Sequence, residues 1–407
     1  MVVVAVVSAC GAADVAPART TSPPPTFDPP TTSSSVSPTS RSTVVDSTEP
    51  SAATSTTAAP IPELDLTFVV FMPRGLPDDF ESRAAPIEGV ESIALRLTET
   101  LHIVQTHDAA GSVVDQPPAG FVIPIQGAAV VASSYVSFAE APVVQLLEEL
   151  AADQVLLSES SARLRRIGAG GRITFADGRQ VTVLAVVPDT AFGAEEIVTT
   201  DPDLVGGPGS ELRFALVSFA GTADELRQAL TLALPDGSGI GVHTRGRLHD
   251  QTTAVRSQVW IKQTFGEFSY KPTGNGRFTI DPAWVAANIV TVEIPLLGTT
   301  RCHRIYADLL IGVMEALIAS GDADAIDRSA FHGCWNARYV ANSSRLSRHA
   351  WGAAADINFF NSLDGGPGSP VSGALLEQMA MAGITSGHDW SIPDPGHFEY
   401  YGFPQDE

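Results

Sequence analysis

Apolar and polar side chains alternate over several short segments in the first half of the chain, which is the pattern of half-buried β-strands. The clearest case is 172–187, RITFADGRQVTVLAVV, where two alternating runs flank Asp177 and Gly178. An Asp-Gly pair between two such runs predicts a tight hairpin turn. The other elements predicted here are strands over 64–71 and 90–104 and helices over 76–85, 142–152 and 222–234. Together these elements predict an α+β domain over 63–245.

The second half of the chain shows the period of an amphipathic helix over 303–320, where apolar residues recur every three or four positions. Its predicted buried face consists of Ile305, Leu309, Leu310, Val313, Met314 and Leu317. A shorter helix is predicted over 374–382, and strands are predicted over 289–294, over 356–360 and after the loop that begins at Ile392. We therefore expect a second domain over 246–407.

Residues 11–62 consist mainly of Pro, Ser, Thr and Ala and contain almost no large apolar side chain. Such a segment cannot bury enough surface to offset the entropy lost on ordering, so it predicts a disordered linker. Residues 1–10 hold a short apolar run followed by small residues and Cys10. This arrangement resembles the end of a bacterial lipoprotein signal, in which Cys10 would be the lipidated residue.

No Lys or Arg precedes that apolar run, although a signal peptide normally begins with a basic region. A start further upstream and an accidental resemblance both explain this, and we favour the first. No segment elsewhere reaches the ~18 unbroken apolar residues of a membrane span. Membrane attachment is therefore expected only through a lipid anchor at Cys10.

The length and the net charge of the chain limit the number of domains and the kinds of partner that it can have. A chain of 407 residues is long enough for two folded domains and a tail. The formal net charge is −22, from 46 acidic and 24 basic side chains. Such a surplus of negative charge argues against a nucleic-acid partner and against an anionic membrane surface.

Two of the three cysteines, Cys302 and Cys334, lie in the second predicted domain. A disulfide between them fits an exported protein. A zinc site that uses Cys302 and the adjacent His303 is an alternative, although no CxxC-type spacing accompanies it. Two buried free thiols are the other alternative.

Two segments near the carboxyl terminus carry the candidate chemistry. The first is 347–356, SRHAWGAAAD, which contains His349 and Asp356; the second is 394–400, DPGHFEY, which contains Asp394 and His397. Two imidazoles and one carboxylate suit a catalytic zinc ion, which needs three protein ligands, an open position and a nearby base. In the first segment, Gly and Ala residues would let the backbone pass close to a metal.

These segments resemble the D-Ala-D-Ala carboxypeptidase and L-Ala-D-Glu endopeptidase family of zinc peptidases, the VanY-like group. The family pattern is Ser-x-His-x-x-Gly-x-Ala-x-Asp, followed by an acidic residue three positions before a His that precedes Phe. The resemblance covers about 266–402 and implies a small antiparallel sheet with flanking helices. It also implies that His349, Asp356 and His397 bind Zn²⁺ and that Asp394 is the general base.

Two further points follow from the same resemblance. Arg338 matches an arginine that precedes the first motif in the family and steadies the scissile carbonyl or a substrate carboxylate. Many members carry Glu at the base position, and the Asp394 of this chain is similar to the endopeptidase and phage-endolysin branch. The side chain is one methylene shorter, so its loop is expected to come closer to the metal.

The sequence thus predicts a zinc-dependent peptidase that acts on peptidoglycan stem peptides, as a D-Ala-D-Ala carboxypeptidase or an L-Ala-D-Glu-type endopeptidase. The expected location is outside the cytoplasm, on the outer face of a bacterial cell membrane. The alternative is a catalytically inactive module that keeps the fold and binds the cell wall or a permease. The element order of 63–245 resembles the extracytoplasmic domains of MacB- or FtsX-like permeases, and its protein partner is not identified.

Overall fold

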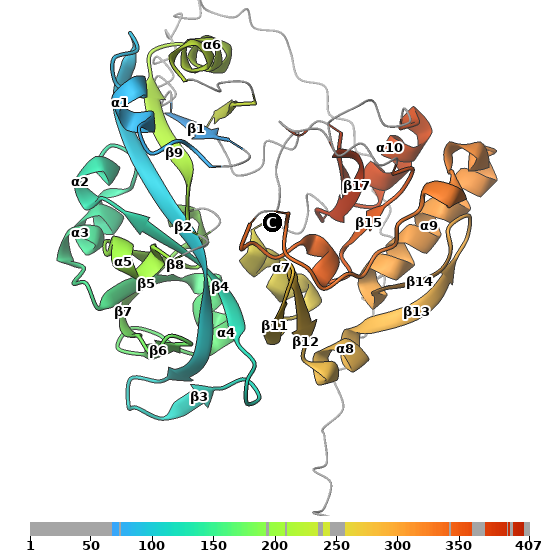
Figure 1. Cartoon of the computed structure of the whole chain (residues 1–407), viewed down its shortest axis with the longest axis horizontal. Coiled ribbons are helices and arrows are strands. Elements are labelled where there is room, and N and C mark those ends of the chain that lie inside the picture. The colour runs from blue at the N-terminus through green and yellow to red at the C-terminus, as the bar shows by residue number, and fades with distance from the viewer. Residues whose placement is uncertain are drawn as a thin grey trace, which may run out of the picture. The chain divides into compact units, whose positions relative to one another are not determined.

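The computed structural model describes ten stretches of the chain: 67–72, 75–192, 195–207, 210–234, 239–244, 257–341, 343–359, 371–388, 390 and 394–402. The predictions for Cys10 and for the linker over 11–62 lie outside these residues. The described part is a mixed α+β protein, as predicted (Figure 1). None of its helices is both long enough and apolar enough to cross a membrane.

A ten-stranded sheet dominates the residues before 245, with the strand order β10-β1-β9-β2-β4-β8-β5-β7-β6 and β3 paired to β2. Pairing is antiparallel except between β4 and β8 and between β5 and β7. The long strand β2 (Val90–His107) pairs with four other strands and forms the spine of the sheet. The remaining strands are β1 (Thr67–Phe71), β3 (Val113–Asp115), β4 (Ile123–Val130), β5 (Gln154–Ser158), β6 (Arg172–Phe175), β7 (Gln180–Val187), β8 (Ile197–Thr199), β9 (Glu211–Phe219) and β10 (Gly241–Thr244).

Local sequence signals are confirmed in this region. The predicted hairpin is formed by β6 and β7, and Gly178 in its turn has a φ of 88°, a conformation that suits glycine. Helix α6 (Ala223–Ala233) begins with a capping box, in which Thr222 and Glu225 satisfy each other's main-chain amides. The other helices are α1 (Phe80–Ala84), α2 (Ala132–Tyr135), α3 (Ala141–Glu149), α4 (Glu159–Arg165) and α5 (Pro202–Val205).

Three small antiparallel sheets occupy the residues after 257, and one hydrophobic cluster joins these elements. They are β11 (Tyr270–Gly274) with β12 (Arg277–Ile280), β13 (Ile289–Ile294) with β14 (Gly298–His303), and β15 (Ala354–Asp356), β17 (Asp394–Tyr400) and β16 (Ile384–Gly387) in the order β15-β17-β16. The helices are α7 (Gln258–Phe265), α8 (Pro282–Asn288), α9 (Arg304–Ser320) and α10 (Gly373–Met381). The expected small antiparallel sheet with flanking helices is thus present.

One strand prediction is wrong in its position. A strand was expected from Asp356 onward, over 356–360, but β15 ends at Asp356. The reason is that Ala354 and Ala355 are fully buried and pair with β17, whereas Asn358 adopts a φ of 55° that interrupts an extended strand. The described residues all belong to one compact unit, and the domain boundary predicted at 245/246 stays a prediction.

Candidate metal centre

Three side chains that are distant in the sequence converge at the small sheet formed by β15, β17 and β16. His349 lies in a short 3₁₀ turn (Arg348–Ala350), Asp356 ends β15, and His397 lies opposite Asp356 in β17. One nitrogen from each imidazole and one carboxylate oxygen all lie within 4.8 Å of one another. The seven-residue spacing of the first motif therefore spans the turn and the strand that follows it.

Hydrogen bonds orient both imidazoles toward a common point. Oδ1 of Asp356 lies 3.1 Å from Nε2 of His349 and 3.1 Å from Nδ1 of His397. On the far side, Nδ1 of His349 lies 2.7 Å from the main-chain carbonyl of Cys334. Nε2 of His397 lies 3.3 Å from Oε2 of Glu399. Outer partners of this kind fix the tautomer and the ring orientation of a metal-binding histidine.

The electrostatics of the cluster favour a cation. Burial raises the pKa of Asp356, but its hydrogen bonds to His349 and His397 outweigh burial and hold that pKa well below its usual range. Burial lowers the pKa of His397, whereas hydrogen bonds to Asp356 and Glu399 raise it to about 9. Both rings are nearly enclosed, with exposed fractions of 2% for His349 and 8% for His397. The carboxylates of Asp356 and Glu399 thus attract positive charge at this point.

Asp394 lies at the start of β17, next to the cluster. It pairs with Gly387 of β16, beyond an irregularity in the register. Burial raises the pKa of the Asp394 carboxyl. The positive charge of His397 lowers that pKa, whereas the negative charge of Asp356 raises it further. A carboxylate with a raised pKa is a better general base near neutral pH than an ordinary aspartate.

The structure also brings Arg338 to this neighbourhood. Its segment forms an isolated bridge with Arg277, and its carbonyl accepts a hydrogen bond of 3.1 Å from the amide of Ser347. Burial raises the pKa of Asp394, and the positive charge of Arg338 is one of the effects that oppose this rise. All five residues that the sequence analysis selected therefore gather in one region.

Cys302 and Cys334 form a disulfide, as predicted, with their Cα atoms 5.1 Å apart. The two alternatives, free thiols and a zinc site at Cys302 and His303, are therefore wrong. His303 instead caps α9, and its Nε2 lies 3.1 Å from the carbonyl of Phe265. Burial lowers the pKa of His303 to about 4, which keeps its ring neutral at pH 7.

The role expected of Gly352 needs correction. We expected a small residue there so that the backbone could approach a metal, but the close neighbour is another stretch of backbone. A Cβ atom on Gly352 would lie 2.5 Å from the amide nitrogen of His303, and the φ of Gly352 is 67°. The glycine therefore allows the first motif to pack against the junction of β14 and α9.

Sequence reasoning missed two contacts of the site. The carbonyl of Cys334 leaves no signature in the sequence, because any residue type supplies a carbonyl. The indole of Trp351, which is fully buried, donates a hydrogen bond of 3.2 Å to the carbonyl of Gly266. Trp351 stands inside the first motif of the sequence, and this position was the signal that could have indicated its structural role. Trp390 lies beside His397, with ring centroids 5.3 Å apart, and forms one wall of the cluster.

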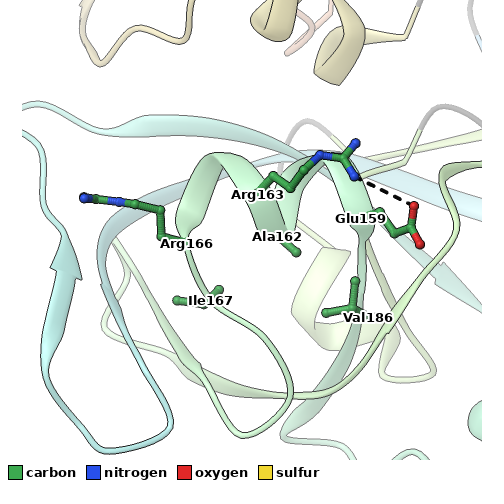
Figure 2. A pocket seen from close by; sticks show the side chains of 6 residues that line it. All are labelled: Glu159, Ala162, Arg163, Arg166, Ile167 and Val186. Carbon is green, nitrogen blue, oxygen red and sulfur yellow. Dashed lines mark ion pairs between the residues drawn. The ribbon is translucent and has the colours of Figure 1, made fainter. Parts of the chain in front are cut away.

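An open hollow of about 520 Å³ lies on helix α4 (Figure 2). Its lining residues are Glu159, Ala162, Arg163, Arg166, Ile167 and Val186. Its ion pair, between Arg163 and Glu159, spans 3.8 Å, and both side chains are more than half exposed. This surface presents no set of metal ligands or nucleophiles, so the cluster around Asp356 is the better candidate site.

Comparison with known proteins agrees with this choice. Residues 341–400 match the family model of D-alanyl-D-alanine carboxypeptidase, and this segment contains His349, Asp356, Asp394 and His397. The matched segment does not include Arg338. The carboxyl-terminal part of the chain is therefore similar to this peptidase family. No curated protein matches the chain.

Two solved structures match with low scores. One is the periplasmic region of MacB from Actinobacillus actinomycetemcomitans, at 13% identity, covering 44% of this chain and 89% of that one with a TM-score of 0.29. The other is the extracellular domain of the noncanonic ABC-type transporter YknZ from Gram-positive bacteria, at 12% identity. This match covers 44% of this chain and 100% of that one, with a TM-score of 0.29. Similarity at this level supports no argument about function.

Proposed function

We propose that this protein is a zinc-dependent peptidase that hydrolyses peptide bonds in peptidoglycan stem peptides, as a D-Ala-D-Ala carboxypeptidase or an L-Ala-D-Glu-type endopeptidase. The convergence of His349, Asp356 and His397, with Asp394 beside them, carries this proposal. The family match of the same segment supports it independently of the geometry.

The donor set fits zinc. Two imidazole nitrogens and one carboxylate oxygen form a common ligand set of catalytic zinc sites, which leave one position open for water or substrate. Nε2 of His349 and Nδ1 of His397 are the nitrogens directed at Asp356, so they would be the ligand atoms. The carbonyl of Cys334 and the carboxylate of Glu399 would hold the two rings in place.

The other side chains supply the proton transfer and the charge. Bound zinc would polarise the scissile carbonyl and make a water molecule easier to deprotonate. Asp394 would accept a proton from the attacking water at its carboxylate and then donate it to the leaving amine. Arg338 would stabilise the negative charge that develops on the carbonyl oxygen, or would hold a substrate carboxylate.

The disulfide supports a location outside the cytoplasm, because such bonds persist in oxidising compartments. Peptidoglycan is found there, and a lipid on Cys10 would keep the enzyme at the outer face of the cell membrane. The net charge of −22 does not suit a nucleic-acid partner. For residues 63–245 we propose a role in binding a protein partner.

Purified muropeptides test the proposal directly. The full chain, loaded with zinc, should release terminal D-alanine or cleave between L-Ala and D-Glu, and mass spectrometry distinguishes the two products. A chelator should abolish cleavage, and added zinc should restore it. The alternative, an inactive cell-wall-binding module, predicts that the muropeptides bind without any change in mass.

A further inference from the structure

Helix α7 contacts both the ten-stranded sheet and the small sheet that carries His397. Two polar side chains of this helix, Gln258 and Lys262, are buried, with exposed fractions of 6% and 1%. Both contact Glu196, which lies directly before β8 of the ten-stranded sheet. Charged side chains are almost never buried unless they are paired, so this arrangement requires an explanation.

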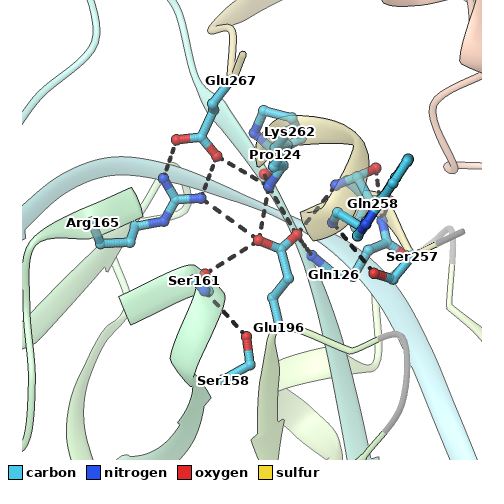
Figure 3. A network of polar contacts seen from close by, with 12 residues as sticks. Pro124, Gln126, Ser158, Ser161, Arg165, Glu196, Ser257, Gln258, Lys262 and Glu267 are labelled. Carbon is cyan, nitrogen blue, oxygen red and sulfur yellow. Dashed lines mark hydrogen bonds and ion pairs between the residues drawn. The ribbon is translucent and has the colours of Figure 1, made fainter. Parts of the chain in front are cut away.

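Figure 3 shows a buried cluster of charges around α7, which we call the α7 charge cluster: Arg165, Glu196, Lys262 and Glu267. Nζ of Lys262 lies 2.8 Å and 2.9 Å from the two carboxylate oxygens of Glu196. It also lies 3.1 Å from Glu267, which forms a two-point pair with Arg165 of α4. Cations and anions therefore alternate along the cluster, from Arg165 through Glu267 and Lys262 to Glu196. These pairs join residues before 245 to residues after 257.

Glu196 is the centre of this cluster. Its carboxylate accepts hydrogen bonds from the main-chain N–H of Gln126 at 3.1 Å and from the hydroxyl of Ser161 at 3.2 Å, in addition to Lys262. Its side chain has an exposed fraction of 0%. A buried charge that is fully hydrogen-bonded is tolerated, but removing one partner leaves the others uncompensated and is strongly destabilising.

Other side chains of α7 contact the candidate metal centre. Trp260 stacks on Tyr400, with ring centroids 5.5 Å apart, and Phe265 meets the same ring edge-on at 5.2 Å. Tyr400 ends β17, three residues after His397. The carbonyl after the helix, on Gly266, accepts the hydrogen bond from Trp351, two residues after His349. His397 is thus linked to α7 through the packed ring of Tyr400, and His349 is linked to the end of α7 through the hydrogen bond of Trp351.

We propose that Glu196 and Lys262 are positioning residues for the candidate metal centre, which act through α7. The charge cluster fixes the helix against the ten-stranded sheet, and the fixed helix holds Tyr400 and Trp351 in place. The part after residue 257 therefore needs the part before residue 245 in order to bind metal with full affinity. This consequence rests on the proposed zinc site, whereas the docking of α7 does not.

Zinc affinity of the full chain tests the proposal, with three variants. Lys262→Met and Glu196→Gln each remove one charge at nearly constant volume, and Glu196→Gln/Lys262→Met removes both. The exposed pair between Arg83 and Asp79 supplies a control, Arg83→Gln. Each single variant should bind zinc about 10–100-fold more weakly, as for the loss of groups that orient metal ligands. The double variant should recover part of this loss, and the control should match the wild type.

Cobalt provides a second readout, since the visible absorption of bound Co²⁺ reports its coordination geometry. Folded single variants should show an altered Co²⁺ spectrum, which a role in stability alone would not produce. Wild-type zinc affinity together with a wild-type Co²⁺ spectrum in both folded single variants would overturn the proposal.

A cleavage experiment covers variants that fail to fold. A protease site is inserted between residues 250 and 251 of the otherwise wild-type chain and is cut after folding. The two fragments should remain together on size exclusion without any metal, and high salt should not separate them because the charges are buried. Separation of the fragments on cutting would refute the docking. If the fragments stay together but the wild type binds no zinc, the proposed function fails and the docking stands.

Discussion

The main-chain carbonyl of Cys334 lies 2.7 Å from Nδ1 of His349, while the sulfur of Cys334 is bonded to Cys302. One residue thus connects a covalent cross-link to the orientation of a candidate metal ligand. Cys302 lies at the end of β14, next to the start of α9, so the cross-link fixes the Cys334 loop to a regular element.

Removing the disulfide should weaken both the fold and the metal site. The bond closes a loop with a sequence separation of 32, for which the chain-entropy model gives roughly 3–4 kcal/mol of stability. Cys302→Ala/Cys334→Ala should lower the free energy of unfolding by about this amount in urea titrations, and it should also weaken zinc binding. Cys10→Ser is the matched control and should change neither quantity. Free-thiol titration of unfolded, unreduced Cys10→Ser protein should find no reactive thiol, and finding two would contradict the disulfide.

The purified protein should carry about one zinc per chain, because the three ligands define one site. His349→Ala and His397→Ala should each lose the metal, as measured by elemental analysis after dialysis. His332→Ala is the matched control, since that side chain is exposed and lies outside the ligand set. Full zinc occupancy in both ligand variants would show that the metal binds elsewhere.

Asp356→Asn should separate metal binding from folding. The substitution keeps the shape of the side chain but replaces an anionic ligand with a neutral one, so zinc affinity should fall steeply. The carboxylate hydrogen-bonds to both imidazoles, and we therefore expect a change in their orientation as well. Chelator competition measures the affinity, and circular dichroism checks that the fold persists. A folded Asp356→Asn variant with wild-type affinity would remove Asp356 from the ligand set.

Acid should destabilise the protein through Glu267. Burial raises the pKa of this carboxyl, but Arg165 and Lys262 outweigh burial and lower it from 4.5 to about 2. Because the folded-state pKa is depressed, its contribution to stability is complete above the ordinary pKa and is lost as the pH falls toward 2. Unfolding free energy should therefore decrease between about pH 5 and pH 2. Glu267→Gln should flatten this part of the curve, whereas Glu377→Gln, at an exposed position of α10, should leave it unchanged.

Local patterns were sufficient to predict much of the structure. The Asp-Gly hairpin at Gly178, the helix predicted from Thr222 and the helix after His303 depend on neighbouring residues, and all three are present. The motif residues of the candidate site also come together, because the two segments pair as β15 and β17.

Contacts between distant segments were not predictable from such patterns. The strand at Asp356 was misplaced, since its position depends on pairing with β17 and on the backbone of Asn358. Gly352 was assigned to the metal, although its neighbour is the backbone of His303. In the α7 charge cluster, Lys262 pairs with Glu196, which lies 66 positions earlier, and Glu267 pairs with Arg165, which lies 102 positions earlier. Pairs between such distant residues have no local signature.

The role of Asp394 is the central claim, and one comparison tests it most directly. Wild type and Asp394→Asn, both with zinc content measured, are incubated with the same muropeptides, and product formation is followed by mass spectrometry. Our account predicts that zinc content stays near one per chain in both, while the rate falls about 10²–10⁴-fold in the variant, which is typical for loss of a general base. Cleavage by Asp394→Asn at the wild-type rate would contradict the account.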